Sequence, residues 1–255
     1  MELFVIEIRA RRALNTTNPT STYPQNMKAF LQLLAVAAIG SASANAASIF
    51  APGDTIFGGR SDGTSFLVGA VGTDGGATVY TDNVWPMAES PDHAIDGVSQ
   101  KYLNFAELNS GLIVTPNFNS GLGSVVTSIQ LWTANDAEGR DPATYELYGT
   151  NAVVAGGGPF ALSTFTLVSS GSLALPVGRN LTGVNPLNDA NSQTVTFTNT
   201  QSYKTYMILF PTVKSEPTVN SMQVGEVQIF GNVIPEPSSC ALLALGSLVA
   251  IRRRR

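Results

Sequence analysis

The chain has 255 residues and a formal net charge of −4, and only 13% of its residues are charged. Between Ala47 and Ile234 acidic residues outnumber basic ones more than two to one. This argues against nucleic-acid binding, which needs Lys and Arg to neutralise phosphates. The single cysteine, Cys240, lies beyond this region, so disulfides within it are excluded. Frequent Gly and Pro between short alternating segments predict one large or two small all-β domains.

The N-terminus predicts a secretion signal. Residues 1–26 carry arginines and a Thr/Asn/Pro run without a helical face, and we interpret them as a mis-assigned start or a disordered extension before Met27. Residues 27–46 combine a lysine, an apolar run and a small-residue site ending at Ala46, which is the pattern of a signal peptide. We therefore expect passage through the secretion translocon and cleavage after Ala46.

Residues 47–233 form the predicted domain, and its first part is rich in Gly and Asp. Phe66–Val71 and Ala77–Thr81 are predicted to be short edge strands separated by turns. The spacing of the acidic residues differs from that of an EF-hand loop or a nonapeptide repeat, so we expect turns here rather than metal sites. His93–Gly97 is predicted to make a tight turn into a strand at Lys101–Phe105.

Ser128–Asn151 is the most clearly patterned part of the domain. Alternation with a period of two predicts a strand at each end, joined by the polar loop Asn135–Pro142. In the second strand, Tyr145 and Leu147 face one way and Glu146 the other. Because loops carried by a rigid sheet often hold binding residues, this loop is where we expect a site.

The later strands are predicted at Phe160–Ser170, Gln193–Thr198, Tyr203–Pro211 and Ser221–Phe230. Tyr203–Pro211 is almost continuously apolar, as expected of a central strand that is buried on both faces. The alternation slips within Ser221–Phe230, which indicates a bulge. No segment of the domain predicts a long helix, and we find no internal repeat.

The C-terminal residues, 234–255, contain a second address signal. An apolar run, Ser239–Ile251, lies between a Pro-Glu-Pro motif and an arginine cluster. The motif residues are Pro235, Glu236, Pro237, Arg252, Arg253, Arg254 and Arg255. This tail resembles the PEP-CTERM sorting signal, which implies removal by an exosortase at the inner membrane. The run is shorter than the roughly 20 residues of a stable transmembrane helix, so we expect a transient anchor with its arginines in the cytoplasm. The resemblance implies a bacterial protein at the cell surface or in the extracellular matrix.

Three segments of the domain resemble discoidin-type (coagulation factor type C) domains. ANDAEGRDPATYELYGTN, at 134–151, is similar to the central segment of that family, with its Arg-Asp-Pro loop. HAIDGVSQKYLNF at 93–105 and VGEVQIFG at 224–231 resemble two further segments in the same order. The resemblance implies a galactose-binding-like β-sandwich of the jelly-roll type.

The same resemblance implies a structural calcium ion at the His93–Gly97 turn. Its ligands would be the carboxylate oxygens of Asp96 and Glu226. Carbonyl or hydroxyl oxygens of Ala94, Ser99 and Lys101 would complete the set. The family often has a second carboxylate or amide just after the glycine, where this chain has Val98. The alternative is an Asp-Gly turn in which Asp96 bonds its own backbone amides.

For a sugar ligand, we expect Arg140 and Asp141 to supply hydrogen bonds, with Trp132 or Tyr102 as an aromatic platform. The alternative is that Arg140 and Asp141 form a local salt bridge of small energy and that Trp132 belongs to the core.

The predicted function is that of an exported, non-catalytic module that binds carbohydrate or matrix polysaccharide. His93 is the only histidine and has no nucleophile in motif context, and a shallow rim lacks the water-excluding cleft that glycoside hydrolysis needs. The alternative function is a structural or adhesive surface protein with no defined sugar ligand.

Overall fold

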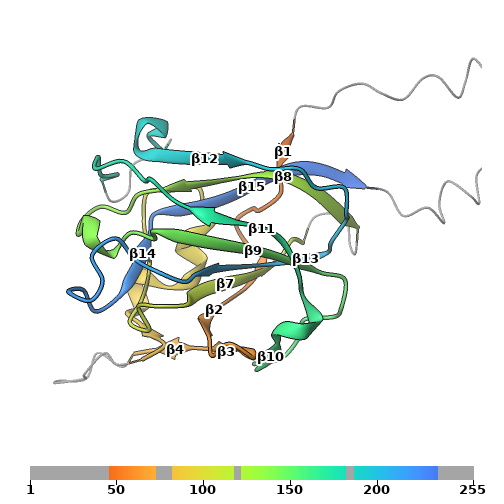
Figure 1. Cartoon of the computed structure of the whole chain (residues 1–255), viewed down its shortest axis with the longest axis horizontal. Coiled ribbons are helices and arrows are strands. Elements are labelled where there is room, and N and C mark those ends of the chain that lie inside the picture. The colour runs from red at the N-terminus through yellow and green to blue at the C-terminus, as the bar shows by residue number, and fades with distance from the viewer. Residues whose placement is uncertain (1–45, 73–81, 118–121, 182–186, 235–255) are drawn as a thin grey trace, which may run out of the picture. The chain divides into compact units, whose positions relative to one another are not determined.

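The computed structural model describes residues 46–72, 82–117, 122–181 and 187–234 (Figure 1). All of them belong to one compact unit, Asn45–Arg255. Two antiparallel sheets pack face to face, which confirms the predicted all-β sandwich. The predicted signal peptide, the strand at Ala77–Thr81 and the sorting tail from residue 235 onward lie outside the described residues. Within the described residues, no helix is long and apolar enough to cross a membrane.

The first sheet has four strands in the order β1–β15–β8–β12, and all neighbours are antiparallel. Their bounds are Ala47–Ser48 for β1, Glu226–Ile234 for β15, Gly123–Trp132 for β8 and Ser192–Thr196 for β12.

The second sheet has seven strands in the order β10–β3–β2–β7–β13–β9–β11. Their bounds are Phe160–Ala161 for β10, Ser65–Val68 for β3, Thr55–Ser61 for β2, Ser110–Thr115 for β7, Thr205–Phe210 for β13, Thr144–Thr150 for β9 and Thr166–Ser172 for β11. Figure 1 shows this sheet below the four-stranded one.

Two short ladders and five single-turn 3₁₀ helices complete the described fold. The ladders pair β14 (Met222–Val224) with β6 (Tyr102–Asn104), and β4 (Ala70–Val71) with β5 (Val84–Trp85). The 3₁₀ helices are η1 (Met87–Glu89), η2 (Pro91–Ala94), η3 (Glu138–Arg140), η4 (Leu162–Thr164) and η5 (Asp189–Asn191).

The hydrophobic core lies between the sheets and follows the predicted alternation. Ile129 and Leu131 of β8 are buried in it, as are Tyr145 and Leu147 of β9. Glu146, which lies between the two β9 core residues, therefore faces the outer side of the seven-stranded sheet. Burial of these large side chains is the main stabilising term of such a sandwich.

The central strand β13 is buried on both faces, as its sequence predicted. Tyr206, Ile208 and Phe210 join the core, whereas Met207 and Leu209 belong to a second apolar cluster on the outer face of the sheet. That cluster also contains buried side chains from β3, β7 and the segment after η4, namely Phe66, Ile113 and Phe165.

The slip in alternation within Ser221–Phe230 coincides with a change of sheet at Gly225. Val224 pairs with β6 and Glu226 with β8, and the Gly225 amide donates to the Trp132 carbonyl at 2.9 Å. A side chain at Gly225 would place its Cβ 2.4 Å from the Thr133 carbonyl oxygen, so only glycine fits this crossing. A bulge follows in β15 between Phe230 and Gly231.

The prediction of one strand at Phe160–Ser170 is wrong. The chain forms β10, then the turn η4, then β11, and the amide of Phe165 closes the turn by donating to the Leu162 carbonyl at 3.0 Å. The reason is the outer apolar cluster, which buries Phe165 and so draws the chain across the sheet between the two strands.

Candidate functional site

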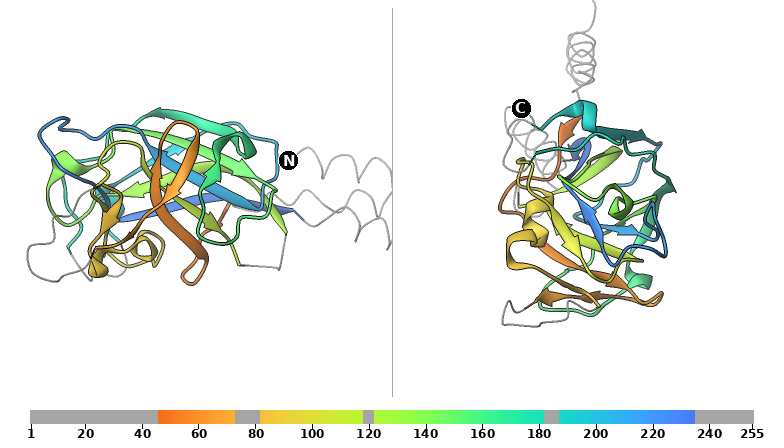
Figure 2. Two further views of the ribbon diagram at one scale, coloured as in Figure 1. Left: turned by 90° about the horizontal axis from the view of Figure 1, so that it is seen from below. Right: turned by 90° about the vertical axis from the view of Figure 1, so that its left-hand side faces the viewer.

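The predicted binding loop, Asn135–Pro142, is held in place by a buried carboxylate. Asp141 is fully buried, and Arg179 donates to both of its oxygens, Nη1 to Oδ1 at 2.7 Å and Nη2 to Oδ2 at 2.8 Å. Lys214 Nζ lies 3.2 Å from Oδ2. These partners come from the segments after β11 and β13, which meet the loop at one end of the sandwich (Figure 2). Both carboxylate oxygens of Asp141 are therefore occupied by ion pairs within the protein.

The alternative of a local Arg140–Asp141 salt bridge is wrong. Arg140 Nη2 donates to Asn220 Oδ1 at 3.3 Å, while Asp141 pairs with Arg179. The partner of Asp141 is set by the tertiary fold, because the two residues meet only when the segment after β11 returns to this end of the sandwich.

The two predicted platform rings are both buried. Tyr102 has no exposed surface, and its hydroxyl accepts from Asn104 Nδ2 at 2.8 Å. Burial raises the pKa of Tyr102 far above its usual value. Trp132 is 6% exposed, and its Nε1 donates to Asp189 Oδ1 at 3.2 Å. Neither ring offers an open face on which a sugar could stack.

The predicted calcium turn brings its two carboxylates together. Glu226 is fully buried and accepts from the Gly97 amide at 3.2 Å, and the charge of Asp96 acts on it. Desolvation, with a smaller contribution from Asp96, raises the pKa of Glu226 to about 8. Asp96 itself accepts from the Val98 amide at 2.9 Å, the backbone bond expected of an Asp-Gly turn, and its Oδ2 lies 2.8 Å from His93 Nδ1.

The other three residues of the predicted calcium set are also in this region. Ala94 ends η2 and is buried, and the Ser99 hydroxyl donates to the Leu181 carbonyl. The Lys101 side chain turns away to an acidic pair, with Nζ 3.2 Å from Glu89 Oε1 and 3.0 Å from Asp136 Oδ1. Only its backbone oxygen is therefore a candidate ligand. In the described part of the chain, no group of three or more His, Cys, Asp or Glu side chains is placed to hold a metal ion.

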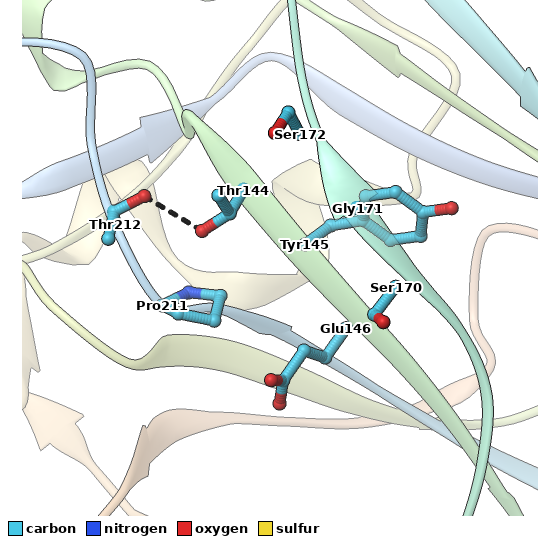
Figure 3. A pocket seen from close by; sticks show the side chains of 8 residues that line it. All are labelled: Thr144, Tyr145, Glu146, Ser170, Gly171, Ser172, Pro211 and Thr212. Carbon is cyan, nitrogen blue, oxygen red and sulfur yellow. Dashed lines mark hydrogen bonds between the residues drawn. The ribbon is translucent and has the colours of Figure 1, made fainter.

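A groove of about 450 Å³ opens on the outer side of the seven-stranded sheet (Figure 3). Neighbouring positions of β9 and β11 and the segment after β13 line it: Thr144, Tyr145, Glu146, Ser170, Gly171, Ser172, Pro211 and Thr212. The register places Ser170 directly opposite Glu146 and Ser172 directly opposite Thr144. Directly opposed residues in antiparallel strands share a face, so these four side chains form two adjacent polar pairs.

The polar groups of this groove are largely uncommitted. The Glu146 carboxylate accepts one hydrogen bond, at Oε2 from the Tyr148 hydroxyl at 2.7 Å. Among the described residues, the hydroxyls of Ser170 and Ser172 make no hydrogen bond, and Thr144 and Thr212 bond only each other, at 2.7 Å. An open hollow with free hydroxyls and a free carboxylate oxygen is suited to a ligand that carries many hydroxyl groups.

A second hollow, of about 180 Å³, is less suited to such a ligand. Its lining includes Phe57, Val68, Trp85 and Pro91 and contains no hydroxyl side chain. Asp92 is its one charged residue.

Sequence reasoning missed the groove, although it placed Glu146 correctly on the outer face. The groove exists because β11 lies beside β9 in one particular register. Alternation within each strand shows which side chains share a face of that strand, but not which strand lies next to it.

No family model matches the chain, and no curated protein matches it. Several solved structures are similar. One is the family 32 CBM from C. perfringens NanJ in complex with galactose, with 14% identity, a TM-score of 0.43, and coverage of 72% of this chain and 98% of that one. Another is the family 32 carbohydrate-binding module from Streptococcus pneumoniae EndoD, with 13% identity and a TM-score of 0.42. The match covers 73% of this chain and 100% of that one. A third contains the CBM32-1 and CBM32-2 domains from Clostridium perfringens ZmpB in complex with GalNAc, with 15% identity and a TM-score of 0.41. The match covers 74% of this chain and 35% of that one.

Proposed function

We propose that this chain is a non-catalytic carbohydrate-binding module of the galactose-binding-like kind, and that it binds sugar in the groove between β9 and β11. The observation that carries the proposal is the row of free polar groups from Glu146, Ser170 and Ser172 on a rigid sheet. Rigid strands fix these groups before the ligand arrives, which lowers the entropic cost of binding. The buried ion pairs of the Asn135–Pro142 loop support the sheet ends rather than contact the sugar.

A glycan array probed with the full chain tests this proposal. Galactose and GalNAc, which two of the similar structures contain, belong in the panel with other neutral and amino sugars. Ser172→Trp fills the groove and should abolish binding. Leu167→Trp is the matched control, because Leu167 is 51% exposed on the same strand and lies outside the groove lining. If wild type binds no sugar, the proposed function is refuted and the structural or adhesive alternative takes its place. If Ser172→Trp binds as wild type does, the groove is refuted as the site and the sugar binds elsewhere.

We also propose that the protein is exported, with a signal peptide before Ala47 and a PEP-CTERM tail after Ile234 that an exosortase removes. The support is the order of charged, apolar and motif residues in the two ends of the sequence. Mass spectrometry of surface material tests both cleavages. An intact terminal segment containing Arg252 would contradict processing of the tail.

A structural calcium ion at the Asp96 turn is a further proposal. The support is the meeting of two carboxylates, because Glu226 is fully buried and the charge of Asp96 acts on it. Within the protein, the Glu226 oxygens accept from the Gly97 amide at 3.2 Å and from Gln228 Nε2 at 3.1 Å. Glu226 and Asp96 would supply charged oxygens, and the carbonyls of Ala94, Ser99 and Lys101 neutral ones. The ion would hold the turn against β15.

Thermal unfolding of the full chain with and without excess chelator tests this, since an ion bound only to the folded state must stabilise it. We expect chelator to lower the midpoint and added calcium to restore it. An unchanged midpoint would show that the Asp-Gly turn closes without an ion.

A further inference from the structure

The carboxylate of Glu146 is the one charged group that lines the groove. It lies on β9 between two neighbouring strands, opposite Ser170 of β11 and Leu209 of β13. Leu209 belongs to the outer apolar cluster, so one flank of the carboxylate is apolar and the other carries the serine hydroxyls. An apolar flank reduces solvent screening and strengthens any ion pair formed there.

This negative charge has no cationic partner among the described residues. The groove lining contains no Lys, Arg or His. Several basic side chains of the described domain are used elsewhere: Lys101 bonds Glu89 and Asp136, Arg140 bonds Asn220, Arg179 bonds Asp141, and Lys214 bonds Glu138 and Asp141. The groove therefore attracts a cation and repels an anion.

The Tyr148 hydroxyl leaves one carboxylate oxygen for that cation. The hydroxyl donates to Glu146 Oε2. Desolvation, this hydrogen bond and the charge of Glu146 together raise the pKa of Tyr148 to about 12. The phenol thus keeps its proton at neutral pH and remains a donor. Among the described residues, Oε1 has no partner, and the register places Ser170 opposite Glu146 on β11.

We infer that Glu146 selects sugars that carry a protonated amino group, as in oligomers of glucosamine, over N-acetylated and acidic sugars. This rests on the proposed function, because it assigns the ligand class of the same groove. The ammonium group would bind Glu146 Oε1, and the ring hydroxyls would bond Ser170 and Ser172. Acetylation removes the charge from the nitrogen, and a uronic acid adds a repelling carboxylate.

Titration calorimetry of the full chain with three soluble oligomers tests the inference: glucosamine, N-acetylglucosamine and galacturonic acid, at a pH that keeps the amine protonated. We expect the glucosamine oligomer to bind about tenfold more tightly than the acetylated one, which corresponds to about 1.4 kcal/mol. The preference should shrink at about 1 M salt, where the Debye length is about 3 Å. The uronic acid oligomer should bind most weakly.

Glu146→Gln keeps the shape of the side chain and should remove the preference, by lowering the affinity for the glucosamine oligomer to that for the acetylated one. Glu216→Gln is the matched control, since it removes the same charge from an exposed position outside the groove lining. Equal affinity for the amino and acetylated oligomers in wild type, or an unchanged preference in Glu146→Gln, would overturn the inference and leave the proposed function in place. No binding of any sugar would overturn both. The salt dependence of wild type gives a second readout should the variant be unstable.

Discussion

The Asp141 ion cluster predicts a large and specific loss of stability when its charge is removed. In Asp141→Asn the volume is kept, but one oxygen becomes an amide that cannot accept from Arg179. Breaking one partner of a buried ion pair costs about 3–5 kcal/mol. Arg179 and Lys214 remain 17% and 19% exposed and keep carbonyl partners, so we expect the lower end, about 3 kcal/mol. For a domain of this size, that lowers the unfolding midpoint by roughly 6–12 °C.

Thermal and urea unfolding followed by tryptophan fluorescence measure this loss, since Trp85 and Trp132 are both buried. The control is Arg140→Gln, which removes one hydrogen bond at a half-buried residue and should change the free energy of unfolding by less than about 0.5 kcal/mol. A change of similar size in the two variants would favour the local Arg140–Asp141 pair and refute the assigned cluster. The assigned cluster would also be refuted if the free energy of unfolding of Asp141→Asn lay within about 0.5 kcal/mol of that of wild type.

Two further predictions concern the sheets and the calcium turn. Gly59→Ala should destabilise by about 1–3 kcal/mol in urea unfolding, because the new Cβ would lie 2.1 Å from the Leu67 carbonyl oxygen, whereas Gly157→Ala, with nothing within 4 Å, should be tolerated. In calcium-free buffer, ionisation of Glu226 opposes folding, since its pKa rises from 4.5 to about 8 in the folded state. The contribution of protonated Glu226 to the stability of the fold is therefore fully present below about pH 4.5 and is lost as the pH rises to about 8. The free energy of unfolding should fall by ~5 kcal/mol over this range, and Glu226→Gln should remove this pH dependence. Equal stability of the two glycine variants, or a pH dependence unaltered in Glu226→Gln, would contradict these accounts.

The sequence predicted the strands whose alternation is unbroken, but it missed β2, which contains two adjacent glycines. β8 and β9 show clear alternation, and their predicted core faces are confirmed. β2 was not predicted, because Gly58 and Gly59 look like turn residues. Both glycines instead allow close packing, since a Cβ at Gly58 would lie 2.3 Å from the Pro91 side chain. A glycine required by a tertiary contact cannot be told from a turn glycine by local pattern.

The candidate site was harder to predict than the fold, because it depends on which residues meet across the sheets. Asp141 was assigned to ligand binding for its place in a polar loop, yet Arg179 and Lys214 enclose it. Tyr102 was assigned as a platform, yet β6 turns its ring into the core. By contrast, the pairing of Asp96 with Glu226, which lie far apart in the sequence, was anticipated from a family resemblance rather than from local pattern.

The central claim is that the groove between β9 and β11 binds sugar, and the most direct measurement is calorimetric titration of wild type, Ser172→Trp and Leu167→Trp with the best glycan from the array. The account predicts saturable binding to wild type and to Leu167→Trp, and none to Ser172→Trp. Equal binding to all three proteins would place the sugar elsewhere and contradict the account.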